Sequence, residues 1–474
     1  MKRTIVQALI IVLLVTCTGY SVQLLDFSPA SIQWMPPQPP NLDAGYTVRS
    51  SATSFTVSST DPWDVAISGN GWTRDGASSD KPVSDFEWKS YCTTQGTMTT
   101  VTTYHDAWQP LSTQTQSVAS GSAGENAQFL MDYRIKLDWH DQPGTYAITL
   151  TYDGTDGTPD TETQDITLDV PATQRLDMTG SFAWVQPTAA DLNRAYLARS
   201  AATSLVVSSN EDWETTVSAP SGWDSVPIGA NITLGDFKWK SHCVTSGTMA
   251  STVTTPDTWT SLTTGSVAVA SGSPGKDGQF LMDYRIDFDW KDPPGDYQIT
   301  PTYQLGTESE NVVITITNPT IQSLDLTEDQ MQWVKVTAAD LDRGYVLSSA
   351  ATSFVVGSNI GWEVIVATSG DEVSGGVHYF TATPGKGQYG LPVTDLYWKS
   401  HVVDKGSLAT APTVQEVEWV TFDAATGACA SKIATTTEAG ADCVVMVDHK
   451  IALNWHDSPD TYTITLTYTL QPSS

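Results

Sequence analysis

The sequence predicts an all-β protein built from three tandem β-sandwiches, and three observations lead to this fold class. Apolar and polar residues alternate with a period of two, which is typical of half-buried strands. Turn-forming residues separate these short runs, and no long amphipathic helix lies between them. The pattern also recurs along the chain, whose 474 residues are enough for about three domains.

The tryptophans show the repeat most clearly. All 17 fall into shared registers, with offsets of 150 residues from Trp34 to Trp184 and 149 residues from Trp184 to Trp333. Later offsets are larger in copy three, which indicates loops inserted at 369–391 and 421–442. The registers are Trp34, Trp184 and Trp333; Trp63, Trp213 and Trp362; Trp72 and Trp223; Trp88, Trp239 and Trp398; Trp108, Trp259 and Trp419; Trp139, Trp290 and Trp455.

Each copy begins with a strand that ends at its first tryptophan, as in 174–184. A one-turn helix is expected next in copies two and three, because Thr188 and Thr337 each precede an Asp by three residues, as in a capping box. Copy one has the proline-rich stretch 36–40 instead. Short strands follow at 52–57, 63–67 and 86–89, and at the matching positions of the other copies.

The most regular stretch closes each copy. In 131–152, apolar residues alternate on both sides of an Asp-Gln-Pro-Gly turn, which predicts two strands joined as a hairpin. The Tyr after this turn is typical of a tyrosine corner, in which the hydroxyl bonds to nearby backbone. The candidates for such a corner are Tyr146, Tyr297 and Tyr462.

Strand-like segments at 165–170 and 312–317 connect the copies and end at prolines, which predicts three domains, 20–170, 171–319 and 320–474. Two interpretations stay open. In one, the segments are connectors and copy three is complete. In the other, they are the last strands of copies one and two, and copy three has an unpaired edge that another copy of the chain or a partner fills.

The N-terminus is typical of a secretory signal peptide, predicted at 1–19. It has a basic start, an apolar run that ends near Val15, and small polar residues after the run. The run is too short to span a bilayer. Cleavage near Gly19 predicts a secreted or cell-surface protein, and lipidation at Cys17 is the alternative.

Charge excludes one class of partner. The chain carries 53 acidic and 23 basic residues, a net charge of −30. Such a surface repels the phosphate backbone of nucleic acids, so we do not expect nucleic-acid binding.

The remaining four cysteines form two groups. Cys429 and Cys443 flank a polar segment of copy three, and in an exported protein we expect them to form a disulfide. Cys92 and Cys243 share a register in which copy three has Val402. The substitution by Val favours two packed free thiols, and cross-linking between domains or subunits is the alternative.

No pattern of catalytic chemistry is found. The seven histidines form no shared set, and no nucleophile elbow, phosphate loop or zinc motif is present. We therefore expect a non-enzymatic protein without a cofactor or metal. The acidic run 153–160 is more typical of an ordinary turn than of a calcium loop, and Asn231 is a candidate glycosylation site.

Exposed tryptophans can stack on sugars, but recurrence in nearly every copy favours core packing. The exceptions lie in polar surroundings and are the candidates for glycan contact: Trp108, Trp259 and Trp419.

The closing strands, at 143–152 and 462–470, resemble the last strand of the WxL-type cell-surface domains of Gram-positive bacteria. Trp63, Trp213 and Trp362 lie where that family has its first Trp-x-Leu, although no position here reads Trp-x-Leu. The resemblance implies surface display of an Ig-like sandwich.

Together these patterns predict an exported structural protein of the cell envelope or the extracellular space, able to self-assemble. Its expected partners are other copies of itself or envelope components. The alternative is an adhesive protein that binds polysaccharide through exposed aromatic residues.

Overall fold

The computed structural model describes residues 23–104, 106–154, 160–254, 257–368, 372–382, 390–429 and 431–474. The predicted signal peptide and Cys17 lie outside these ranges, so both stay predictions. None of the helices within them is long and apolar enough to cross a membrane.

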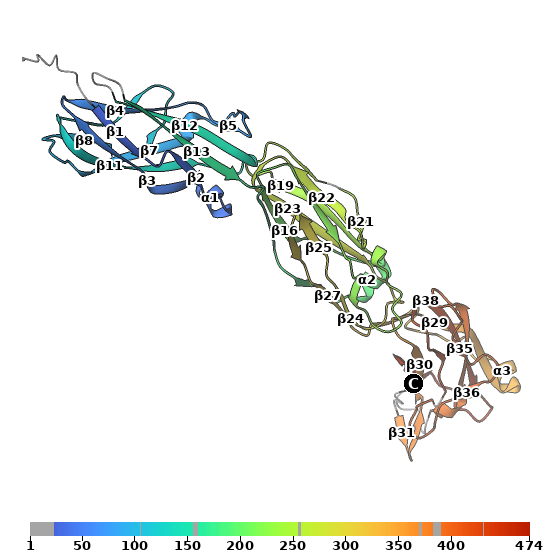
Figure 1. The fold of residues 1–474 in the computed structure, drawn as a ribbon. Helices are drawn as coiled ribbons and strands as arrows, with labels where there is room; N and C mark the ends of the chain where they lie inside the picture. Colours follow the sequence, from blue (N-terminus) through green and yellow to red (C-terminus); the bar gives the residue numbers. More distant parts are fainter. Residues whose placement is uncertain are drawn as a thin grey trace, which may run out of the picture.

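Strand pairing divides the described residues into three groups, which follow one another in a row (Figure 1). We call them the first, second and third units. Every strand pairs only within its own unit in the described ranges. Each unit has its own hydrophobic core, and Ala441 of the third unit packs against the core of the second. The predicted all-β class is therefore confirmed. The domain boundaries at 19, 170 and 319 stay predictions.

The first unit consists of two main sheets and a short helix, α1 (Pro39–Ala44). One sheet has the order β1 (Gln23–Ser28), β3 (Tyr46–Ser59), β11 (Gly124–Lys136), β7 (Phe86–Thr94) and β9 (Gln109–Pro110). The other has the order β2 (Ser31–Trp34), β13 (Thr161–Val170), β12 (Gly144–Gly154), β4 (Trp63–Gly69), β10 (Gln116–Gly121) and β8 (Val101–Thr103), with β5 (Thr73–Arg74) and β6 (Ala77–Ser78) beside β12. A 3-10 turn, η1 (Val83–Asp85), precedes β7.

The second unit repeats this order with helix α2 (Ala189–Arg194) and turn η2 (Leu234–Asp236). Its first sheet is β14 (Gln174–Met178), β16 (Tyr196–Ser209), β23 (Gly275–Asp287), β19 (Phe237–Thr245) and β21 (Thr260–Ser261). Pro301 divides the opposite layer into two sheets, because proline cannot donate a ladder hydrogen bond. These are β15 (Phe182–Ala183), β27 (Ile314–Asn318), β24 (Gly295–Ile299) and β18 (Trp223–Ser225), and β20 (Thr252–Thr254), β22 (Val267–Gly272), β17 (Trp213–Ser218), β25 (Thr302–Leu305) and β26 (Glu308–Asn311).

The third unit keeps the first sheet and shortens the opposite layer. Its first sheet is β28 (Gln322–Leu326), β29 (Tyr345–Ser358), β38 (Gly440–Ala452), β34 (Leu396–Asp404) and β36 (Val420–Thr421), with α3 (Ala338–Arg343) and η3 (Val393–Asp395). The opposite layer is β35 (Thr413–Val414), β37 (Ala434–Thr436), β30 (Trp362–Thr368) and β40 (Leu466–Pro472). Two small pairs are β31 (Glu372–Ser374) with β32 (Val377–Tyr379), and β33 (Thr381–Ala382) with β39 (Tyr462–Thr463).

The predicted hairpin in 131–152 is wrong. β11 pairs with β3 and β7, whereas β12 pairs with β13, β4 and β5, so the two strands lie in opposite sheets. The alternation of apolar and polar residues is the same for a hairpin and for two strands in opposite sheets, because in both cases the apolar sides of the strands face one core. Across that core the hydroxyls of Tyr133 and Tyr152 lie 2.5 Å apart, and those of Tyr284 and Tyr303 lie 2.7 Å apart.

The predicted tyrosine corners are confirmed in all three units. Each hydroxyl donates to the carbonyl four residues earlier: Tyr146 to Gln142 at 3.0 Å, Tyr297 to Pro293 at 2.7 Å, and Tyr462 to Ser458 at 2.7 Å.

The short helices are present in every unit. Thr188 and Thr337 form the predicted capping boxes with Asp191 and Asp340. In the first unit, where the sequence predicted none, α1 begins at Pro39 because a proline in the first turn loses no hydrogen bond there.

The segments between the copies are strands of the sheets. β13 runs antiparallel to β12 over ten residue pairs and parallel to β2, and β27 takes the same place between β24 and β15. The interpretation as mere connectors is therefore wrong. In the third unit, no described residue pairs with β40 on that side.

Candidate functional site

The candidate glycan-binding tryptophans lie half-buried on the outer face of the first sheet of each unit. In the first unit the Trp108 ring has the ammonium of Lys89 4.9 Å from its centroid and the guanidinium of Arg134 4.8 Å away. Arg134 also lies 5.2 Å from the ring of Tyr46. We call Tyr46, Arg134, Trp108 and Lys89 the first aromatic strip.

The other units have the same strip. In the second, Lys240 lies 5.3 Å from Trp259, and Arg285 lies 4.3 Å from Tyr196. In the third, Lys399 and Lys450 lie 5.2 and 4.8 Å from Trp419, and Lys450 also lies 5.9 Å from Tyr345. Cation–aromatic contacts at such exposed positions each stabilise by about 0.5–1 kcal/mol.

Beside each strip, on the same face of the sheet, an Asp fixes an irregularity of the sheet. The carboxylates of Asp132, Asp283 and Asp448 accept from the backbone N–H groups of Ser51, Ala201 and Ala350, at 2.7, 2.7 and 2.6 Å. All three donors are non-glycine residues with φ near +50°. The carboxylate compensates the strain of this left-handed backbone, so its recurrence has a structural cause.

A charge pair beside the strip is reversed between two units. Glu87 forms ion pairs with Arg134 and, at 3.0 Å, with Lys136. In the matching positions of the second unit, Lys238 pairs with Asp287. Exchange of the two charges preserves the attraction within the pair but would change which ligands it attracts. The ion pair therefore has a role in packing rather than in ligand binding.

This arrangement restricts sugar binding. Aromatic stacking on a sugar needs an open ring face, and at Trp108, Trp259 and Trp419 one or two cations lie over the ring. The strip therefore acts as part of the sheet's own packing. Glycan contact by these residues stays a prediction.

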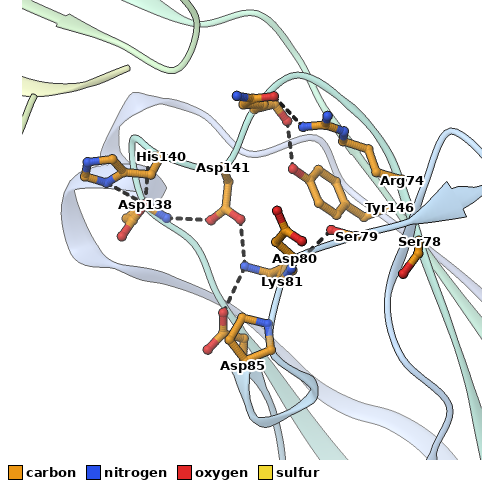
Figure 2. Close-up of a pocket in the computed structure, with 12 residues that line it drawn as sticks. Arg74, Ser78, Ser79, Asp80, Lys81, Asp85, Asp138, His140, Asp141 and Tyr146 are labelled. Carbon is orange, nitrogen blue, oxygen red and sulfur yellow. Dashed lines mark hydrogen bonds and ion pairs between the residues drawn. The ribbon is translucent and has the colours of Figure 1, made fainter. Parts of the chain in front are cut away.

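A cavity of about 350 Å³ lies at one end of the first unit, between the β5–β7 segment and the β11–β12 connection (Figure 2). The Lys81 ammonium lies between the carboxylates of Asp141, at 2.8 Å, and Asp85, at 3.3 Å. Arg74 donates to the side chain of Gln142 at 2.6 Å. One ammonium is thus shared by two carboxylates, and the Arg74 guanidinium bonds to a neutral amide, so hydrogen bonds within the protein already engage these charged groups.

The position of Lys81 between the two carboxylates is occupied by an apolar residue in the other units. In the register of Lys81 the sequence has Ile232 and Leu391, while both carboxylates are retained. Without the cation, burial raises the pKa of Asp292 to about 6, and nearby Asp289 and Asp236 add to the effect. Burial likewise raises the pKa of Asp395, with a further contribution from Asp457. No group of metal-binding residues is present within the described ranges.

Cys429 and Cys443 are free cysteines in this structure, and their disulfide stays a prediction. Cys443 lies in the core of the third unit on β38 and is 1% exposed, and Cys429 packs against the same core from a loop. Cys429 lies in that loop, with its sulfur 3.9 Å from the carbonyl oxygen of Thr421. Burial raises the pKa of Cys443 to about 12, which keeps the thiol protonated.

Cys92 and Cys243 are also free, as the packed-thiol interpretation requires. Cys92 packs against the core of the first unit, and burial raises its pKa. Cys243 is exposed, however, so the prediction of a buried site is wrong for this copy. Cross-linking through either thiol stays a prediction.

Asn231 is exposed, and its glycosylation stays a prediction. Residues 155–159 lie outside the described ranges. At their borders, Asp160 accepts from the backbone N–H of Leu25 at 2.9 Å and Asp153 accepts from the Thr161 hydroxyl at 2.9 Å, and the ordinary turn at 153–160 stays a prediction.

Sequence reasoning missed the cations of the strips. A signal was available, because each fourth-register tryptophan is followed by Lys89, Lys240 or Lys399. On a strand this lysine points to the face opposite the buried tryptophan, where it meets the candidate glycan-binding ring.

No family model matches the chain, and no curated protein matches it. Among solved structures, the chain is similar to the CupB6 tip adhesin from Pseudomonas aeruginosa, at 9% identity over 63% of this chain and 98% of that one, with a TM-score of 0.29. It is also similar to the CsuC–CsuE chaperone–tip adhesion subunit complex of Acinetobacter baumannii, at 11% identity, 63% and 100% coverage and a TM-score of 0.25. A collagen adhesin from S. aureus gives 10% identity, 63% and 93% coverage and a TM-score of 0.17. At these scores the comparisons carry no conclusion about function.

Proposed function

We propose that this protein is an exported, non-enzymatic surface protein with a structural role, in which sandwich units form a stiff rod. The observation that carries the proposal is the packing between successive units. It would let the chain hold its ends apart, as a spacer or envelope component does.

The two junctions use the same contacts. Thr173 and Ile321, in the linkers, each donate a backbone hydrogen bond at 2.8 Å, to the side chains of Asn210 and Asn359 respectively. Each Asn side chain donates in turn to a linker carbonyl, that of Pro171 at 3.0 Å or Pro319 at 2.9 Å. Fixed linkers of this kind restrict motion between units.

Contacts between unit surfaces reinforce the first junction. The Arg175 guanidinium contacts the Asp43 carboxylate at 2.6 Å and lies 5.5 Å from the Trp139 ring. His140 Nε2 donates to the carbonyl oxygen of Thr248 at 3.1 Å. Such contacts favour a stiff rod and count against units that move freely relative to one another.

The second candidate function is adhesion to a polysaccharide, which the half-buried rings of Trp108, Trp259 and Trp419 favour. Their cations count against it, because they lie over ring faces that a sugar would use.

Cell fractionation, N-terminal sequencing and electron microscopy test the proposal. We expect the native protein outside the cytoplasm, beginning near Tyr20, and rods or assemblies at the cell surface. A cytoplasmic protein with Met1 intact contradicts it.

A glycan array tests the second candidate, with Trp108→Ala as the variant and His456→Ala, at an exposed position away from the strips, as the matched control. Saturable binding lost only in the tryptophan variant replaces the structural proposal by the adhesive one.

A further inference from the structure

Among the described residues, the third unit has no strand in the place that β13 and β27 take in the other two. In the first unit, β13 fills the space between β12 and β2, and its inward residues Gln164, Ile166, Leu168 and Val170 are at most 3% exposed. In the second unit, Val312, Ile314 and Ile316 of the matching segment are at most 1% exposed. No described residue takes this place in the third unit, where β40 ends its sheet.

The neighbours of the absent strand are correspondingly open. Ile148, Leu150 and Tyr152 of β12 are at most 2% exposed, whereas the matching residues, Ile464, Leu466 and Tyr468, are only half-buried. The segment that forms β2 in the first unit forms no strand at 327–337 in the third. Both sides of the space therefore lose the burial that a strand gives them in the other units.

One ring nitrogen of a buried histidine in the third unit also has no hydrogen-bond partner among the described residues. In the first unit Tyr133 donates to the Gln164 side chain of β13 at 3.0 Å, and Gln164 bonds to Thr53 as well. The residue in the register of Tyr133 is His449, which is 1% exposed. Its Nε2 lies 3.2 Å from the Tyr468 hydroxyl, and its Nδ1 has no hydrogen-bond partner in the described residues. Buried polar groups of this kind normally have partners.

We propose that the free edge of β40 accepts an extended β-strand from another polypeptide, antiparallel to β40 and beside 327–337. The chain's own β13 and β27 define the chemistry of this partner. Its inward residues are mainly branched aliphatic and alternate with outward residues that are mainly polar. The first of the four inward positions accepts either Gln or Val, and the last accepts either Val or Asn. Strand addition of this type gives affinity through the backbone ladder and selectivity through alternate side chains.

This inference goes beyond the proposed function, because an accepting edge serves a rod, a polymer or an adhesin equally. It has its own test. We would titrate a synthetic peptide of residues 161–170, Thr-Glu-Thr-Gln-Asp-Ile-Thr-Leu-Asp-Val, onto the full chain without the predicted signal peptide. The control is the same peptide with Ile166→Asp and Leu168→Asp, which keeps the length and the backbone while changing the apolar face.

We expect saturable binding by calorimetry, at least tenfold weaker with the control peptide. Hydrogen exchange at β40 should slow on binding, with no change at β12 of the first unit. Equal binding of both peptides, or protection located elsewhere, overturns the proposal. If the free chain is already protected at β40 because it forms dimers there, the partner is a second copy and a strand from a different polypeptide is excluded.

An extended variant of the chain makes the test independent of peptide solubility. Residues 155–170 are appended after Ser474, so that the added strand can fold back beside β40. We expect the thermal midpoint of the third unit to rise by about 5 °C or more, and peptide binding to be lost. The same appendage with the two Asp substitutions should change neither. No rise with the unaltered appendage also overturns the proposal.

Discussion

At the scale of single residues, a buried histidine in the core of the third unit takes the place of a tyrosine in the other two. His449 occupies the register of Tyr133 and Tyr284, and each of these three residues contacts a tyrosine across the core. Burial lowers the pKa of His449 to about 4, and the nearby Asp448 opposes this only in part. The imidazole is therefore neutral in the folded protein at pH 7.

This residue predicts that the third unit is sensitive to acid. The unfolded chain binds a proton near pH 6.5 and the folded one only near pH 4, so stability is lost as the pH falls through this range. His449→Tyr, the residue of the other units, should remove about 2 kcal/mol of this pH dependence. Denaturant unfolding at pH 7.5 and 4.5 measures it. His456→Gln, at an exposed position, is the control, and an unchanged pH dependence in His449→Tyr contradicts the prediction.

At the scale of elements, local chemistry was predictable and strand partners were not. The capping box at Thr188 and the corner at Tyr146 depend on residues only three or four positions apart, and both were confirmed. The pairing of β11 and β12 depends on which sheet each strand joins, and the sequence pattern is the same for either sheet. The same holds for β13, whose alternating residues do not reveal whether it ends one unit or connects two.

The aromatic strips show the corresponding limit at the candidate site. The sequence identified Trp108, Trp259 and Trp419 as distinct from the core tryptophans, and the structure has all three half-buried. Their cations come from strands distant in sequence, as with Arg134 on β11. A contact across strands requires the register, which composition and spacing do not provide.

The burial of β13 predicts that this strand is essential to the first unit. Ile166 is fully buried opposite Ile148, whereas Thr163 on the same strand is exposed. Ile166→Ala should destabilise the first unit by about 2–4 kcal/mol through lost burial and the cavity left behind. Thr163→Ala should change stability by less than about 0.5 kcal/mol. Hydrogen exchange resolved by unit measures both effects, and equal losses in the two variants contradict the role assigned to this strand.

At the scale of the whole molecule, the last tryptophan register marks the ends of the units. In each unit its indole N–H donates to the helix, to Asp43 at 2.9 Å, Asn193 at 2.8 Å and Asp342 at 3.1 Å. Trp139 and Trp290 are 0% and 4% exposed, whereas Trp455 is 62% exposed. Residues of the next unit contact the first two rings, so this register is both a core position and a junction contact.

The final prediction concerns the second junction, where a glycine of the third unit lies against a tryptophan of the second. A Cβ at Gly357 would lie 2.9 Å from the Trp290 ring, too close for a rigid indole held by Asn193. Gly357→Ala should therefore separate the second and third units while each stays folded. Small-angle scattering should show a broader distribution of overall dimensions, with unchanged circular dichroism. In Gly235→Ala, the nearest atom to the new Cβ is 3.6 Å away, and the scattering should match that of the parent chain. If the two variants scatter alike, the contact between Trp290 and Gly357 does not hold the rod straight, and the linker held by Asn359 must do so alone.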